Sequence, residues 1–78
     1  MSDFPKEYFI PLTNNENLLG RIIINKIHDK YCTEIDIVQI ESKKIFHHVQ
    51  QLFNFPEEQE ALDQSVQKLA QFLKKFLQ

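Results

Sequence analysis

The last third of the chain, residues 56–78, has the apolar periodicity of one amphipathic helix. Its apolar residues recur at alternating steps of four and three: Leu62, Val66, Leu69, Leu73 and Phe76. This spacing places them on one face of a helix. The repeat lasts only about two heptads, which is too short for a coiled coil. We therefore expect the residues before the helix to supply an apolar surface for it.

Signals at both ends support this helix. Asn54 is a good N-cap residue, and Pro56 suits a first turn because its missing N–H is not needed there. Acidic residues follow Pro56, and Lys74 and Lys75 lie near the C-terminal end, as the helix dipole favours. The sequence therefore predicts a helix that runs from Pro56 to Gln78.

The composition predicts one small domain. The 78 residues carry a net charge of −2, and no basic stripe is present, so binding to nucleic acid is not favoured. The single cysteine, Cys32, excludes an intramolecular disulfide and points to a reducing compartment. There is no leader pattern and no apolar run of about 18 residues, so we expect a cytoplasmic protein without a membrane span.

The residues before the helix read as strands. Leu18 to Ile27 and Tyr31 to Glu41 have strand composition, with turns predicted at Asp29-Lys30 and at Ser42-Lys43. A shorter strand from Tyr8 to Thr13 would lie at an edge because of Pro11, and residues 1–7 are expected to be loosely ordered.

Pairing the strands about these turns divides the side chains between two faces. The face predicted to receive the helix contains Ile22, Ile24, Ile35, Ile37, Phe46 and Leu52. The opposite face contains Arg21, Asn25, Glu34, Asp36, His47 and Gln51, together with further apolar residues. A slip of one residue would exchange the two sets, so the apolar pattern favours this register.

Residues 44–53 fit either a strand or a helix. The helical alternative would give a β-hairpin followed by a helical hairpin, but it would put Lys43 and Lys44 in a first turn, where cations are unfavourable. We favour the strand. The predicted fold is α+β: a three- to four-stranded antiparallel β-meander with one long C-terminal helix packed on one face.

The residues that could carry chemistry do not form a known motif. His47, His48, Cys32 and His28 lack the spacing of metal ligands, and Gly20 alone does not make a phosphate loop. We therefore predict no metal, no cofactor and no catalytic residues.

Charged residues on the sheet leave two alternatives open. Glu34 and Asp36 share a face with Arg21 across from them, which is typical of cross-strand pairing but leaves open a small enzyme or ligand binder. The second alternative is a small regulatory factor linked to nucleic acid, from a phage, a plasmid or an antitoxin system. Its basic residues would be Lys26, Lys30, Lys43 and Lys44.

Residues 53–62 resemble the strand-to-helix junction of small meander-plus-helix families such as the HicB-like antitoxins. The resemblance covers these ten residues and lacks the Pro-Gly-Cys element that usually precedes the junction in that family. It implies no function for this chain.

The face that the helix leaves bare gives the functional hypothesis. Six of its residues are apolar and interleave with polar ones: Ile23, Ile27, Val38, Ile40, Ile45 and Val49. One helix cannot cover both faces of a sheet, and exposed apolar area on a small domain often marks an interface. We expect a non-enzymatic protein-interaction module that forms a homodimer through this face or through an edge strand.

Overall fold

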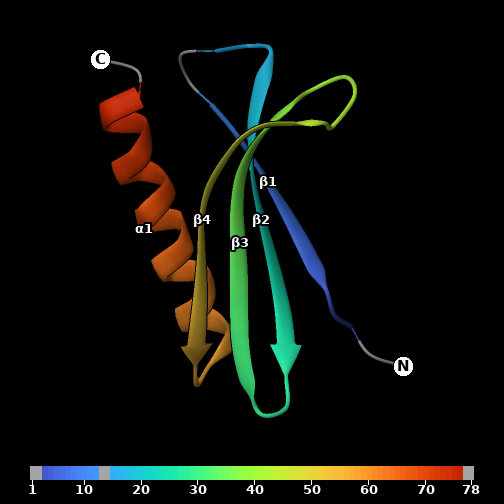
Figure 1. Ribbon diagram of the computed structural model, residues 1–78, viewed down its shortest axis with the longest axis vertical. Helices are drawn as coiled ribbons and strands as arrows, with labels where there is room; N and C mark the ends of the chain where they lie inside the picture. Colours follow the sequence, from blue (N-terminus) through green and yellow to red (C-terminus); the bar gives the residue numbers. More distant parts are fainter. Residues whose placement is uncertain (1–2, 13–14, 77–78) are drawn as a thin grey trace.

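The computed structural model describes residues 3–12 and 15–76 of the 78-residue chain. It contains four strands and one helix: β1 (Lys6–Pro11), β2 (Leu18–Ile27), β3 (Lys30–Gln39), β4 (Ile45–Phe55) and α1 (Glu58–Phe76). The strands form an antiparallel meander in the order β1-β2-β3-β4, and α1 packs against one face of it (Figure 1). The predicted α+β fold is confirmed, and the helical alternative for residues 44–53 is wrong.

The core lies between α1 and the two central strands. Ile22 and Ile24 of β2 and Ile35 and Ile37 of β3 have no exposed surface. Burial alternates along β2 from Leu18 to Ile24, as expected for a strand with one covered face. These four isoleucines occupy the face on which the sequence pattern places them.

The turn between β2 and β3 differs from the predicted one. It lies at His28 and Asp29, one residue earlier than expected, and His28 adopts a positive φ of 58°. Ile22 therefore pairs with Ile35 instead of Ile37. Moving the centre of a hairpin by one residue shifts the pairing by two, and a shift of two keeps every side chain on its predicted face.

The pairing of β3 with β4 contains irregularities that reverse part of the prediction. Register shifts occur between Ile35 and Asp36 and again between Ile37 and Val38. His47, and not His48, therefore pairs with Ile37, and its ring stacks on Phe72 of α1 with centroids 5.0 Å apart. A bulge moves side chains by one residue, so these assignments change faces.

Phe46, which the prediction placed on the helix-facing side, is 52% exposed for the same reason, and Phe53 is 60% exposed. Val49 shows the reverse change. The prediction put it on the uncovered face, but it packs against the core beneath α1.

The helix begins later than predicted. Its first helical hydrogen bond is donated by the Ala61 N–H to the Glu57 carbonyl at 3.1 Å, so Glu57 takes the N-cap position. The predicted N-cap, Asn54, lies inside β4 with a φ of 68°. Leu77, Gln78 and the Phe76 side chain lie outside the described residues. No helix in the described ranges combines the length and the apolar character needed to cross a membrane.

Strand β1 begins at Lys6, so the expectation of a loose segment over residues 1–7 is wrong for Lys6 and Glu7. The Lys6 ammonium lies 2.8 Å from Glu58 Oε2 in the first turn of α1. This contact ties the edge strand to the start of the helix.

Two contacts fix α1 on the sheet. A Cβ added at Gly20 would lie 2.6 Å from Leu69 Cδ2, so the Leu69 side chain occupies the space that a side chain at position 20 would need. The Ser65 hydroxyl donates to Thr33 Oγ1 at 2.7 Å, and both residues are buried. The apolar stripe therefore meets the sheet at a glycine and at a satisfied polar pair.

Gly20→Ala is expected to destabilise the fold by about 1 kcal/mol, because the new methyl group must displace the buried Leu69 side chain. Chemical denaturation measures the change. Combining it with Leu69→Ala should cost less than the sum of the two single changes, and strict additivity would contradict the proposed contact.

Ser65→Ala is expected to cost about 1–2 kcal/mol, because it leaves the buried Thr33 hydroxyl without its partner. The double variant Ser65→Ala/Thr33→Val removes both polar groups and should recover most of that loss. Thermal and urea unfolding of the three proteins test this, and a double variant less stable than Ser65→Ala would contradict it.

Candidate functional site

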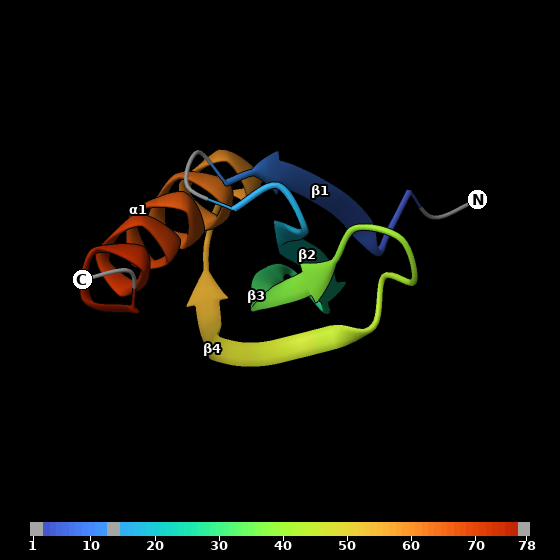
Figure 2. The same cartoon turned by 90° about the horizontal axis from the view of Figure 1, so that it is seen from above.

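The sheet face opposite α1 is partly covered by the chain itself. The loop between β3 and β4, residues 40–44, lies on the opposite side of the sheet from α1 and curves toward β1 (Figure 2). The Ile40 N–H donates to the Asn17 carbonyl at 3.0 Å, and the Lys43 ammonium lies 5.7 Å from the centre of the Phe9 ring. One end of the face is therefore closed.

A cluster of charged residues occupies the middle of this face. Arg21 of β2 pairs in register with Asp36 of β3, and Arg21 Nη2 lies 3.1 Å from Asp36 Oδ2. Glu34 and Glu7 carboxylate oxygens lie 3.9 Å and 3.7 Å from the same guanidinium group. His48 of β4 completes the cluster, with Nδ1 2.8 Å from Asp36 Oδ1.

Burial makes Asp36 the centre of the charged cluster. Its side chain has no exposed surface, while that of Arg21 is 14% exposed and that of His48 is half exposed. Because an ionised carboxylate can only accept hydrogen bonds, His48 must carry its proton on Nδ1. The buried carboxylate is thus held between a guanidinium group on one side and an imidazole N–H on the other.

The pKa values of the two carboxylates of β3 shift in opposite directions. A hydrogen bond to Asp36, followed by partial burial, raises the pKa of Glu34 above its ordinary value. For Asp36, burial alone would raise the pKa, but the hydrogen bonds from Glu34, His48 and Arg21 outweigh it, so the pKa is lowered. The pair therefore takes up its first proton on Glu34, which then donates to Asp36.

The sequence predicted part of the charged cluster. It placed Arg21, Glu34 and Asp36 on one face, and the structure brings these three together. Asn25, which the prediction put with them, pairs instead with Cys32 toward the turn. The predicted register put His48 opposite Ile37 on the helix-facing side, and the bulges of β4 reverse its face, whereas Glu7 was missed because β1 was expected to begin after it.

Glu34, Asp36 and His48 are the described residues that could hold a cation, since one ligand atom of each lies within 4.8 Å of the others. The Arg21 guanidinium already occupies the near side of Asp36, and a positive group there disfavours a metal ion. The arrangement neutralises itself in part and does not require an added ion.

The six residues predicted to form an interface have different surroundings. Val38 is fully buried on the face near the loop of residues 40–44, and Val49 packs beneath α1, so neither contributes exposed area to the uncovered face. Ile23 and Ile40 are half-buried, whereas Ile27 and Ile45 are more than half exposed. The exposed apolar residues therefore lie toward the ends of the sheet, with the charged cluster between them.

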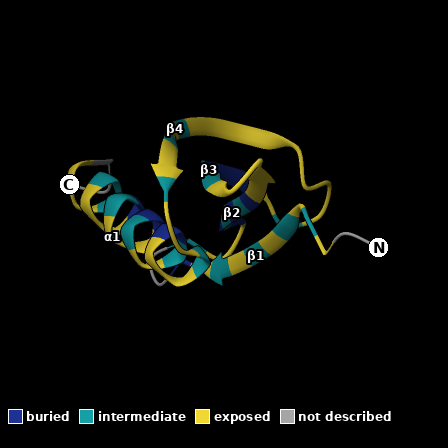
Figure 3. Ribbon diagram, turned by 90° about the horizontal axis from the view of Figure 1, so that it is seen from below, coloured by how far each residue is buried: buried dark blue, intermediate teal, exposed yellow. Residues whose placement is uncertain are grey.

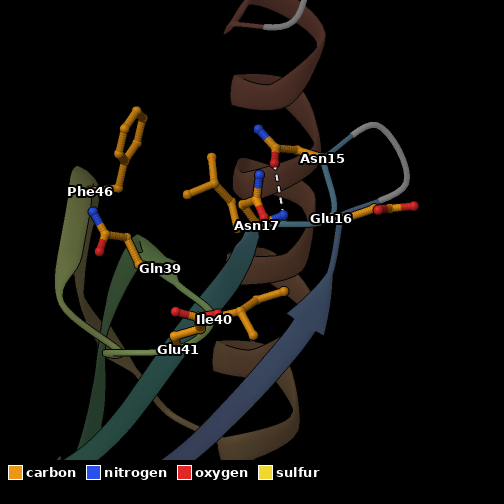
Figure 4. Close-up of a pocket in the computed structure, with 8 residues that line it drawn as sticks. Asn15, Glu16, Asn17, Gln39, Ile40, Glu41 and Phe46 are labelled. Atoms are coloured by element: carbon orange, nitrogen blue, oxygen red, sulfur yellow. Dashed lines mark hydrogen bonds between the residues drawn. The ribbon is translucent and has the colours of Figure 1, made fainter.

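A hollow of about 520 Å³ lies where the β1–β2 loop meets the loop of residues 40–44 (Figure 4). The Asn17 N–H donates to Asn15 Oδ1 at 2.9 Å on one side of it, and Gln39 and Phe46 lie on the other. In Figure 4 the Glu16 side chain points away from Phe46 and Gln39. The polar groups do not converge on one point, so the hollow does not have the geometry of a catalytic site.

The lysines considered for nucleic-acid binding lie at opposite ends of the sheet. Lys26 and Lys30 flank the β2–β3 turn, whereas Lys43 and Lys44 belong to the loop at the other end (Figure 1). Lys26 and Lys43 also lie near the rings of Tyr31 and Phe9. They do not form one continuous basic surface.

No family model matches the sequence, and neither a curated protein nor a solved structure shows significant similarity to the chain. The functional argument therefore depends on the geometry of the molecule.

Asp36→Asn is expected to reduce the stability at pH 7 by about 3 kcal/mol, because it leaves Arg21 without its buried counter-charge. The folded-state pKa of Asp36 is lowered, so its contribution is present above the ordinary range of an aspartate and is lost as the pH falls through the folded value. Urea denaturation between pH 7 and pH 3 should show that the stability difference between the wild type and Asp36→Asn becomes smaller in acid. An equal difference at both pH values would contradict this.

Glu34→Gln is expected to change the stability at pH 7 in the opposite direction to Asp36→Asn. The folded-state pKa of Glu34 is raised, so its contribution is present below the ordinary range of a glutamate and is lost as the pH rises through the folded value. A glutamine can donate to Asp36 at any pH, so the variant should be more stable than the wild type at pH 7. The melting temperature measures this, and a clear loss of stability at pH 7 would contradict the assignment.

Proposed function

We propose that this chain is a non-enzymatic protein-interaction module that forms a homodimer through the outer edge of β4. The observation that carries the proposal is the character of that edge. Within the described sheet, β4 is an edge strand that pairs with β3 alone. An edge strand offers unpaired backbone groups to another chain unless something blocks them.

The two edges of the sheet differ in how they are protected. β1 is six residues long and contains Lys6, Glu7 and Pro11, which discourage the pairing of β1 with the β1 of a second copy. β4 is eleven residues long and contains no charged residue, no proline and no glycine. The register shifts in β4 are its one visible protection.

Exposure of β4 supports the same edge. Eight of its eleven residues are exposed, and Figure 3 shows β4 at the outside of the molecule and exposed along most of its length. Ile45 near one end is 53% exposed, and Phe53 near the other is 60% exposed. A strand added here would cover apolar side chains as well as backbone groups.

The charged cluster favours the edge over the uncovered face as the dimer contact. Three carboxylates, from Glu7, Glu34 and Asp36, surround the single Arg21 guanidinium, so the middle of the face carries an excess of negative charge. Two faces brought together at this point would repel each other. β4 contains no aspartate, glutamate, lysine or arginine, so its self-pairing brings together no excess of carboxylates.

A two-fold axis near Gln50, the middle of β4, gives a self-complementary arrangement. Ile45 of each copy would then lie opposite Phe55 of the other, and the two sheets would join into one. Ile27 lies outside this contact and stays available to other partners. A cytoplasmic setting, in which Cys32 stays reduced, is part of the same proposal.

Gln50→Lys is expected to shift the protein toward the monomer, because the two lysines would meet across the axis. The loss should be about tenfold or more in the dimer dissociation constant, which is about 1.4 kcal/mol. Gln71→Lys, at an exposed position of α1, changes the net charge equally and should behave as wild type.

Sedimentation equilibrium of the three proteins at micromolar concentrations measures the effect. A wild-type protein that stays monomeric up to about 100 μM would contradict the homodimer, since that affinity is below about 5.5 kcal/mol. A dimer that Gln50→Lys does not weaken would contradict the assignment to β4.

A further inference from the structure

A second surface lies on the opposite edge of the sheet, between β1 and α1. A groove of about 540 Å³ runs between them. Tyr8, Phe9 and Ile10 of β1 form one wall, and Leu62 and Val66 of α1 form the other. Asp63 and Gln67 add polar groups along the helix wall.

Val66 shows that the groove wall is not part of the core. It belongs to the apolar stripe that the sequence assigns to the helix–sheet contact, yet it is 41% exposed. Leu69 on the same stripe is almost fully buried on Gly20. The helix therefore carries more apolar surface than the sheet covers, and the excess faces the groove.

The backbone of β1 lines the same groove. Among the described strands, β1 pairs only with β2, so its outer edge has no strand beside it. An extended segment placed there would pair with β1 and point every second side chain toward α1. Six residues of strand span about 20 Å, which corresponds to a short linear segment.

Charge argues for the type of segment. Asp63 is exposed on the helix wall, and Glu60 is exposed one turn earlier on α1. Lys6 of β1 is already paired with Glu58 at 2.8 Å. A basic segment complements this wall, whereas the β1 strand of a second copy would bring Glu7 and Pro11.

We propose that the groove between β1 and α1 binds an extended peptide segment of a partner protein, in which the side chains that face α1 are apolar except for one basic residue. The segment adds to β1 as a fifth strand, its apolar side chains contact Leu62 and Val66, and a basic side chain pairs with Asp63. The site is independent of β4, so it can be tested whether or not the chain dimerises.

The probe is the synthetic peptide acetyl-Val-Thr-Val-Thr-Lys-Thr-amide, in which both valines and the lysine share one strand face, titrated into the full chain labelled with ¹⁵N. Amide shifts are expected along β1 and around Asp63, with a Kd of about 0.1–1 mM. The matched peptide with glutamate in place of lysine should bind at least about tenfold more weakly.

Two variants and a control sharpen the test. Val66→Glu should abolish the shifts, because it places a charge in the apolar wall at a position exposed enough to leave the fold intact. Asp63→Lys should reverse the preference in favour of the acidic peptide. Gln71→Glu, outside the groove, should bind the basic peptide as the wild type does.

Absence of shifts up to millimolar peptide would overturn the proposal. So would shifts confined to β4, equal binding of both peptides, or binding that Val66→Glu leaves unchanged. Normal spectra of the unliganded variants establish that any loss reflects the groove and not unfolding.

Discussion

Leu69 of α1 lies on Gly20 of β2, where any side chain larger than hydrogen would collide with it. This contact brings the helix down onto the sheet and closes the apolar core over Ile22 and Ile37. A single helix covers only one face of the sheet, so the other face and both edge strands depend on other parts of the chain. The loop of residues 40–44 closes one end of that face, and the charged cluster occupies its middle.

Most of the fold could be predicted because the strand pattern before residue 42 and the helical pattern after residue 56 are distinct, whereas residues 44–53 fit either pattern. Ile35 lies between polar neighbours, and a two-residue error at the turn leaves the faces of Ile22 and Ile35 unchanged. The local arrangement of β4 could not be predicted, because its bulges follow from pairing with β3 and leave no trace in composition. One such shift exchanges His47 and His48, and with them a residue of the charged cluster.

The same limit applies to the surfaces that carry the proposals. Sequence periodicity assigns Val66 to the core, since it cannot tell how far the sheet extends beneath the helix. Periodicity also assigns Val38 to an exposed face, because it does not reveal the loop that closes that end. The absence of charge in β4, in contrast, is visible in the sequence once the strand is known to lie at an edge.

Hydrogen exchange of the β4 backbone amides at several protein concentrations tests the homodimer most directly. If β4 pairs with a second copy, amides near Gln50 that are not bonded to β3 become protected as the concentration rises, while those of β1 do not change. Protection of β4 that is the same at low and at high micromolar concentration would contradict the account.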